Sequence, residues 1–180
     1  IRGEYRPEAQ AEEAMLELYS DPKKFFSVTY VTEGMESVLD GALDALEKGS
    51  AGPIVLPSLF GGGKTHTLLA LLHALRRPEA LLEAEPRERA RRLYERVRRA
   101  LEGGVDIVVV DGDYERYAPS PRAPLHVGAY SVQSIWGYIG HCLGRYDAVR
   151  GYDAEFAAPS VDSLERLFEG KRVVVLIDEV

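Results

Sequence analysis

The sequence predicts an α/β fold with a parallel sheet, and three observations lead to that prediction. Short apolar runs typical of buried strands alternate along the chain with segments of helical periodicity. One such run, at 54–56, enters a glycine-rich turn, and another, at 173–177, ends in two acidic residues. Strands that alternate with helices pair in parallel through crossover connections, so we expect a three-layer α/β core.

Composition narrows the class of protein. The chain has 180 residues, 46% of them hydrophobic, which is enough for one sizeable core. Its formal net charge of −7 argues against nucleic-acid binding through the overall field, but not against a local basic patch. The single cysteine, Cys142, cannot form an intrachain disulfide, and we expect it in the core. Without a long apolar stretch or a signal-peptide pattern, we expect a cytoplasmic protein with no membrane partner.

The part of the chain before the glycine-rich turn is predicted to be mainly helical. Residues 7–19 have helical spacing, whereas 25–31 are rich in aromatic and β-branched residues and are expected to be extended. The clearest helix spans 33–48, because Thr32 is placed to cap its start and Gly49 to end it.

Helices and strands then alternate to the end of the sequence. We expect helices over 64–76, 85–101, 131–143 and 162–169, and loops at 111–125 and 144–159. Buried strands are expected at 54–56, 105–110 and 173–177. The expected domains are an N-terminal helical lead, 1–52, and a core, 53–180, with an arginine-rich helical insertion at about 79–102.

The glycine-rich turn has the features of a phosphate-binding loop. An apolar run precedes it, Gly-Lys-Thr ends it, and an apolar helix follows. Glycines let backbone N–H groups curl around an anion, and the helix that begins near Lys64 directs its positive end to the same place. Ser58 stands where this pattern usually has its first glycine. The predicted nucleotide contacts are Ser58, Gly61, Gly62, Gly63, Lys64, Thr65 and His66.

The acidic pair after the last apolar run supplies the second half of such a site. Alone, Asp178 and Glu179 could equally be a strand that runs out into a polar turn. Together with the upstream loop they indicate a nucleoside-triphosphatase, in which Thr65 and Asp178 hold Mg²⁺. Glu179 would orient the attacking water and Lys64 would neutralise developing charge, so these two are the predicted catalytic residues.

Three segments give the sequence a more specific resemblance. T-Y-V-T-E-G-M at 29–35, F-G-G-G-K-T-H-T-L-L-A-L at 60–71 and S-I-W-G-Y-I-G at 134–140 resemble a prokaryotic family of uncharacterised AAA+-like P-loop ATPases. Members are large, and some are encoded beside DNA methyltransferases in phage-defence islands. The resemblance implies a P-loop NTPase core that binds ATP and hydrolyses it with Mg²⁺ to drive conformational work. It also implies a homo-oligomer at full length, within a larger assembly for which DNA is a plausible target.

The sequence reads as the N-terminal fragment of such a protein, truncated after the Asp-Glu strand. It starts at Ile1 and stops at Val180, so the sensor, arginine finger and lid of that class would lie beyond its end. We therefore expect the fragment alone to hydrolyse ATP poorly. The alternative function is a non-hydrolysing, nucleotide-dependent scaffold or switch in a DNA-modifying or defence complex. A third is a motor whose turnover is stimulated by nucleic acid.

The segment 85–99 allows two interpretations. It holds seven arginines and three glutamates, a composition that could contact DNA phosphates. It could also be a solvated helix face, because Glu85 and Arg89 are spaced i,i+4, as are Glu88 with Arg92 and Glu95 with Arg99. We favour the solvated face.

Other polar residues near the two motifs also have alternative roles. His66 could pack and orient the loop, which we favour, or approach the nucleotide. Asp111 and Asp113 could act near the metal, but the chemistry of turns explains them more simply. Tyr30 would border the adenine if the family resemblance extends to that segment.

Overall fold

The computed structural model describes residues 15–49, 52–56 and 63–179. The chain forms two compact units, Ile1–Glu102 and Gly103–Val180. Backbone contacts are dense within each unit and separate the two units. The predicted domain boundary between 52 and 53 concerns a different division of the chain and stays a prediction.

Helices build the described part of the first unit. Residues 15–20 are helical, as expected for that part of the predicted helix 7–19. The other elements are α2 (Pro22–Ser27), α3 (Glu33–Lys48), α4 (Lys64–Arg76), the 3₁₀ helix η1 (Pro78–Glu83) and α5 (Arg87–Ala100). Helices α3 and α4 have the predicted bounds, and α5 begins two residues later than expected.

Helix α3 begins and ends where its capping residues predict. Thr32 Oγ1 accepts a hydrogen bond from the Met35 amide at 3.2 Å, which satisfies one of the N–H groups left over at a helix start. Gly49 has φ +62°, a left-handed conformation that ends helices and suits glycine. Leu39 and Leu43 are fully buried, so this helix forms one wall of the core of the first unit.

Helix α2 corrects the prediction that 25–31 is extended. Asp21 caps this helix through its side chain, which accepts from the Lys24 amide at 2.9 Å, and Pro22 occupies the first turn. Phe25 and Phe26 are fully buried, so the aromatic residues that suggested a strand are core residues of a short helix. Only Tyr30 lies in an extended bridge, parallel to Glu85.

The predicted strand at 54–56 is also wrong. The described residues 52–56 have no regular secondary structure. Ile54 and Val55 are exposed, by 47% and 74%. A strand exists through hydrogen bonds to a neighbour, and the described pairings include none for these residues.

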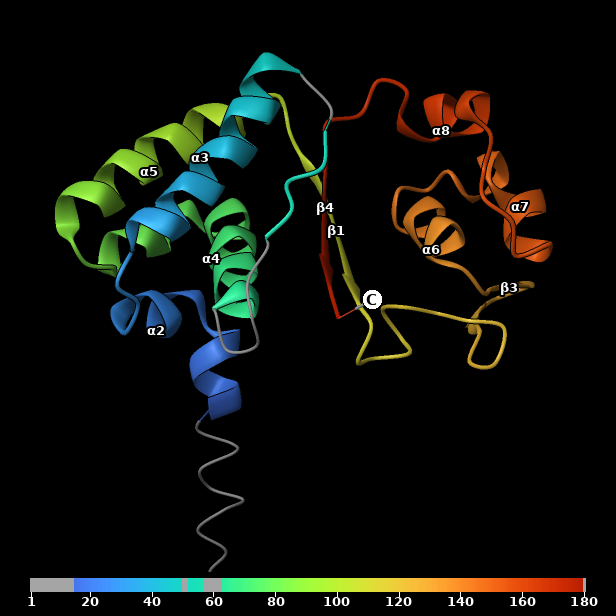
Figure 1. The fold of residues 1–180 in the computed structure, drawn as a ribbon, viewed down its shortest axis with the longest axis horizontal. Coiled ribbons are helices and arrows are strands. Elements are labelled where there is room, and N and C mark those ends of the chain that lie inside the picture. Colours follow the sequence, from blue (N-terminus) through green and yellow to red (C-terminus); the bar gives the residue numbers. More distant parts are fainter. Residues whose placement is uncertain (1–14, 50–51, 57–62, 180) are drawn as a thin grey trace, which may run out of the picture. The chain divides into compact units, whose positions relative to one another are not determined.

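Helices α3 and α5 lie side by side (Figure 1). A row of ion pairs joins them. Arg89 pairs with Glu33 and Glu36, and Arg92 with Glu36 and Asp40. The side chain of Arg96, only 18% exposed, reaches Asp40, Asp44 and Glu47 at 2.6–3.1 Å. For Arg89 and Arg92, these pairs between helices replace the predicted i,i+4 pairs with Glu85 and Glu88, because α3 presents its carboxylates directly to the two arginines.

Arg96 is the most enclosed cation of this row. Its burial opposes the charged form, but hydrogen bonds to Asp44, Glu47 and Asp40 outweigh that effect and raise its pKa. On the acidic side, hydrogen bonds from Lys48 and then Arg96 lower the pKa of the Asp44 carboxyl. Both groups therefore stay charged together at neutral pH.

The second unit contains the parallel sheet that the sequence predicts. Strands β1 (Asp106–Asp111) and β4 (Val173–Asp178) pair in parallel, in a register that joins Val108 to Val175 and Asp111 to Asp178 (Figure 1). The described chain is thus a mixed helix and strand structure with a two-stranded parallel sheet, compatible with the α/β class.

Between β1 and β4, a β-hairpin takes up the start of the predicted helix 131–143, and two short helices lie within the predicted loop 144–159. The hairpin is built around a turn at Gly128, whose φ of +54° suits glycine, so helix α6 starts later than the predicted 131. Ser134 caps α6 by accepting from the Gly137 amide at 3.0 Å. The elements are β2 (Leu125–Val127), β3 (Tyr130–Val132), α6 (Ile135–Cys142), the 3₁₀ helix η2 (Tyr146–Ala148), α7 (Arg150–Ala154) and α8 (Val161–Phe168).

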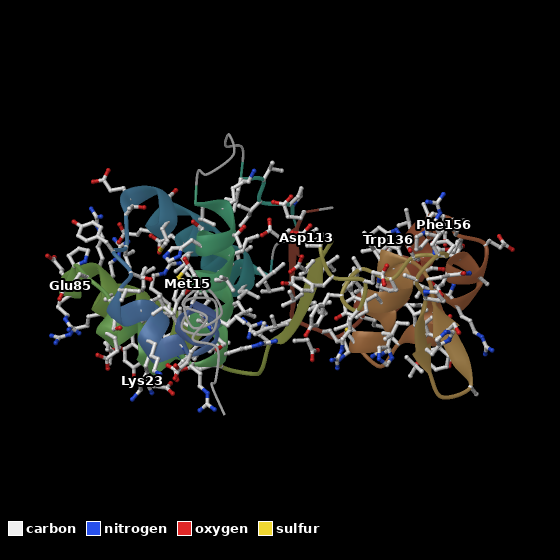
Figure 2. All side chains as sticks on the ribbon, turned by 90° about the horizontal axis from the view of Figure 1, so that it is seen from below. Met15, Lys23, Glu85, Asp113, Trp136 and Phe156 are labelled. Atoms are coloured by element: carbon white, nitrogen blue, oxygen red, sulfur yellow. The ribbon has the colours of Figure 1, made fainter. Side chains whose placement is uncertain are left out.

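The core of the second unit lies between β1 and α6. Val108, Val110 and Ile139 are buried there, and Trp136 packs against the cluster while partly exposed (Figure 2). Cys142, expected in the core, is exposed at the last residue of α6, whereas the next residue, Leu143, is buried in the core.

A buried carboxylate ties α6 to α7. Asp153 is fully buried and accepts hydrogen bonds from Ser134 Oγ at 2.6 Å and from the Tyr146 hydroxyl at 2.8 Å. The Gln133 amide also donates to it, at 3.2 and 3.3 Å. Burial, aided by the bond to Asp153, raises the pKa of Tyr146 to about 12. A Cβ added at Gly137 would lie 2.1 Å from the carboxylate, so only glycine permits this approach.

We predict that Gly137→Ala destabilises the second unit by about 1–3 kcal/mol, the usual cost of overpacking. The added methyl group would displace Asp153 from its hydrogen bonds. Gly151→Ala is the control, because Gly151 is also helical and has no neighbour within 4 Å of the added Cβ. Urea unfolding should separate the two variants, and equal midpoints would contradict the prediction.

Candidate functional site

The predicted phosphate-binding loop is described only in its second half. Ser58, Gly61 and Gly62 lie outside the described residues, whereas Gly63 and Lys64 lie within them. The contacts predicted for the first three therefore remain predictions.

Gly63 forms the junction between this loop and α4. Its φ of +75° lies in the left-handed region, where residues with a side chain are strained. Helix α4 begins directly after it, and Thr67 donates to the Gly63 carbonyl through both its amide and its hydroxyl, at 2.9 Å each. As a glycine, the capping residue offers no side-chain acceptor to the first helical amides.

The N-terminus of α4 is chemically suited to an anion. The aligned peptide dipoles give it partial positive charge, and the N–H groups of a first helical turn can donate to a phosphate. Lys64, half-buried, and Thr65, exposed, are the first two residues of the helix. The structure thus puts an ammonium and a hydroxyl in the same helical turn.

His66 packs against α2, in agreement with the favoured interpretation. Its ring centroid lies 4.5 Å from that of Phe25, and its Nε2 lies 3.2 Å from Thr29 Oγ1. Because Thr29 donates its own proton to the Phe25 carbonyl, its oxygen accepts from His66. The contact of His66 with Thr29 could not be predicted, because no sequence pattern links two positions 37 residues apart. A nucleotide contact by His66 stays a prediction.

His73 makes a second contact of the same kind, two turns along α4. Its Nε2 donates to the Tyr19 carbonyl at 2.8 Å, and its ring lies 5.1 Å from that of Phe25. Burial lowers the pKa of His66, and chiefly burial lowers that of His73. Both rings therefore stabilise the docking of the N-terminal helices in their neutral form.

The other half of the predicted site lies at the end of the parallel sheet. Asp178 is the last residue of β4 and is paired in register with Asp111 of β1. Its carbonyl accepts from the Gly112 amide at 3.0 Å, which carries the pairing into the turn. Carboxyl ends of parallel strands are where α/β proteins bind ligands, so these carboxylates occupy a suitable edge.

Turn chemistry accounts for Asp111, as the sequence favoured. Its Oδ1 accepts from the Asp113 amide at 3.1 Å and so stabilises the turn after β1. Asp113 is exposed on that turn (Figure 2). Beside β4, Glu179 is exposed and has φ +51°, an uncommon conformation for glutamate.

The two halves of the predicted site belong to different compact units. Lys64, Thr65 and His66 belong to the first unit, and Asp178 and Glu179 to the second. Within the described ranges, no group of three His, Cys, Asp or Glu residues could hold a metal ion by itself. Tyr30 is 62% exposed, and its predicted approach to an adenine stays a prediction.

Comparison with known proteins identifies a family. The DUF499 N-terminal domain matches residues 9–180, which is nearly the whole sequence, and the chain therefore belongs to that family. No curated protein and no solved structure matches it. No helix in the described ranges is long and apolar enough to cross a membrane.

We predict that acidification from about pH 7.5 to about pH 5.5 destabilises the first unit. The pKa of His66 and that of His73 are lowered on folding, so the unfolded chain binds protons first. The stability they contribute is present above the ordinary pKa of 6.5 and is lost as the pH falls through the folded values. The Asp44 carboxyl, whose pKa is lowered from 3.8, takes up a proton only in solution more acid than this range.

Urea unfolding followed by circular dichroism at the two pH values measures this effect. The double variant His66→Gln and His73→Gln should lose most of the pH dependence. His126→Gln is the control, since His126 is exposed and belongs to the second unit. A wild-type midpoint that does not change with pH would disprove the role given to the two rings.

Proposed function

We propose that this member of the DUF499 N-terminal domain family binds ATP with Mg²⁺ and carries the residues for hydrolysis of the γ-phosphate. The observation that carries the proposal is the start of α4. A glycine in the left-handed region is followed by Lys64 and Thr65 in the first helical turn, at the end of a Gly-Gly-Gly-Lys-Thr sequence. This combination of glycines, helix dipole, ammonium and hydroxyl is that of a phosphate-binding loop.

Each predicted residue has a distinct chemical task in this proposal. Backbone N–H groups of 61–65 hold phosphate oxygens, and Lys64 neutralises charge that develops on them. Thr65 and Asp178 would hold Mg²⁺, which bridges phosphate oxygens and offsets their charge. Glu179 would orient the attacking water and take up its proton.

The carboxylate edge supports the metal and water half. Oxygen ligands suit Mg²⁺, which keeps several waters and needs only one or two carboxylates. Asp178 ends a strand held in register by β1, so its backbone position is fixed by the sheet. The same proposal includes a three-layer P-loop ATPase core that works in a homo-oligomer or on DNA.

Lys64→Ala should weaken binding of Mg-ATP by about 10- to 100-fold, as expected for the loss of a charged hydrogen-bond partner. Titration calorimetry on the purified protein measures this change. Lys23→Ala is the matched control, because Lys23 is exposed and lies outside the loop (Figure 2). Unchanged affinity in Lys64→Ala, or equal losses in both variants, would contradict the proposal.

Glu179→Gln should separate binding from turnover. The amide keeps the shape of the side chain but cannot take a proton, so Mg-ATP should bind with near wild-type affinity while phosphate release falls at least 100-fold. Phosphate release by the full-length protein is the readout. Wild-type ATP binding with no turnover at all would favour the alternative of a nucleotide-dependent scaffold, and full turnover in Glu179→Gln would exclude this glutamate.

A further inference from the structure

Six of the seven arginines of α5 fall into two sets by direction. Arg89, Arg92 and Arg96 face α3 and pair with its acidic residues. At 3.6 residues per turn, the positions of Arg87, Arg91 and Arg98 fall within about 40° of one another on a different side of the helix. All three of these arginines are exposed.

An aromatic ring lies among these outer arginines. The Arg98 guanidinium carbon lies 5.7 Å from the centre of the Tyr94 ring, within cation–π range. A shallow groove of about 270 Å³ runs beside it, lined by Leu82, Arg87, Arg91, Tyr94 and Glu95. We call this surface, formed by Arg87, Arg91, Tyr94 and Arg98, the outer face of α5.

Most of what holds α5 in place lies away from the outer face, in the fully buried Leu93 and Val97 and in the ion pairs to α3. On the outer face, the Arg87 guanidinium donates to the Leu82 carbonyl and pairs with Glu85 at the start of the helix. That pair is more than half exposed on both sides, and such pairs contribute little and exchange readily. Arg91 and Arg98 are exposed to a ligand, and Arg87 can exchange its exposed contacts for a phosphate.

We propose that the outer face of α5 binds single-stranded nucleic acid. Arg87, Arg91 and Arg98 would contact phosphates, while Tyr94 would stack on a base. The first and last of these arginines are separated by about 16 Å along the helix axis, enough for several nucleotides of an extended strand. A groove that combines cations with an aromatic ring is the usual composition of single-strand sites, whereas duplex phosphates need no ring.

Because the whole chain is acidic, only the arginines of the outer face would attract the nucleic acid. With a net charge of −7, attraction depends on these few arginines, so affinity should be modest and fall steeply with salt. Glu95 lines the same groove, and its carboxylate opposes a phosphate. Its removal should therefore tighten binding, an effect that damage to the fold would not produce.

Fluorescence anisotropy of a labelled oligothymidine of roughly 20 nucleotides tests the proposal between about 50 mM and about 200 mM salt. The triple variant Arg87→Ala, Arg91→Ala and Arg98→Ala should bind at least tenfold more weakly. The slope of log affinity against log salt should decrease in magnitude by about 2, from three lost phosphate contacts. Glu95→Gln should bind at least twofold more tightly, and Tyr94→Leu at least threefold more weakly.

Two control proteins keep the test specific. The triple variant Lys23→Ala, Arg76→Ala and Arg77→Ala removes the same charge from exposed residues elsewhere in the first unit and should bind like the wild type. Replacement of the three outer arginines by lysine should retain most of the affinity. Equal losses in the two alanine triples, no binding at low salt, or tighter binding of a duplex of the same length would overturn the proposal.

Discussion

The position of α4 is the constraint on which the first unit depends. Its C-terminal half is buried from Ala70 to Leu75, and on one side His66 and His73 fix the N-terminal helices to it. The helix can begin where it does because Gly63 adopts a left-handed conformation that other residues avoid. A rigid, well-packed helix therefore presents its first turn, and with it Lys64 and Thr65, at a fixed point.

Helix α5 shows how one segment can serve three purposes through its periodicity. One side packs in the core through Leu93 and Val97, a second pairs with the carboxylates of α3, and the third carries the outer arginines. Burial gives the first side its energy, whereas exposed ion pairs contribute little singly and act mainly to orient the helices. An acidic chain can in this way keep a local basic surface.

Capping residues and periodicity were sufficient to predict α3, α4 and the two paired strands, because these signals are local. One error is local: Phe25 and Phe26 suggested a strand, although Asp21 and Pro22 supply the cap and first turn of a helix. The other omissions arise where distant residues decide. The contacts of Thr29 with His66 and of Asp153 with Gly137 join positions that no spacing rule connects. In the site, the motif residues followed from type and order, while their partners did not.

The proposed function requires that the first turn of α4 binds phosphate. Backbone amide resonances of Gly63, Lys64 and Thr65, followed by nitrogen–proton NMR during addition of Mg-ATP, test it most directly. We expect large, saturable shifts at these amides and much smaller shifts in α5. No shift at the three amides, or saturable shifts confined to other parts of the chain, would contradict it.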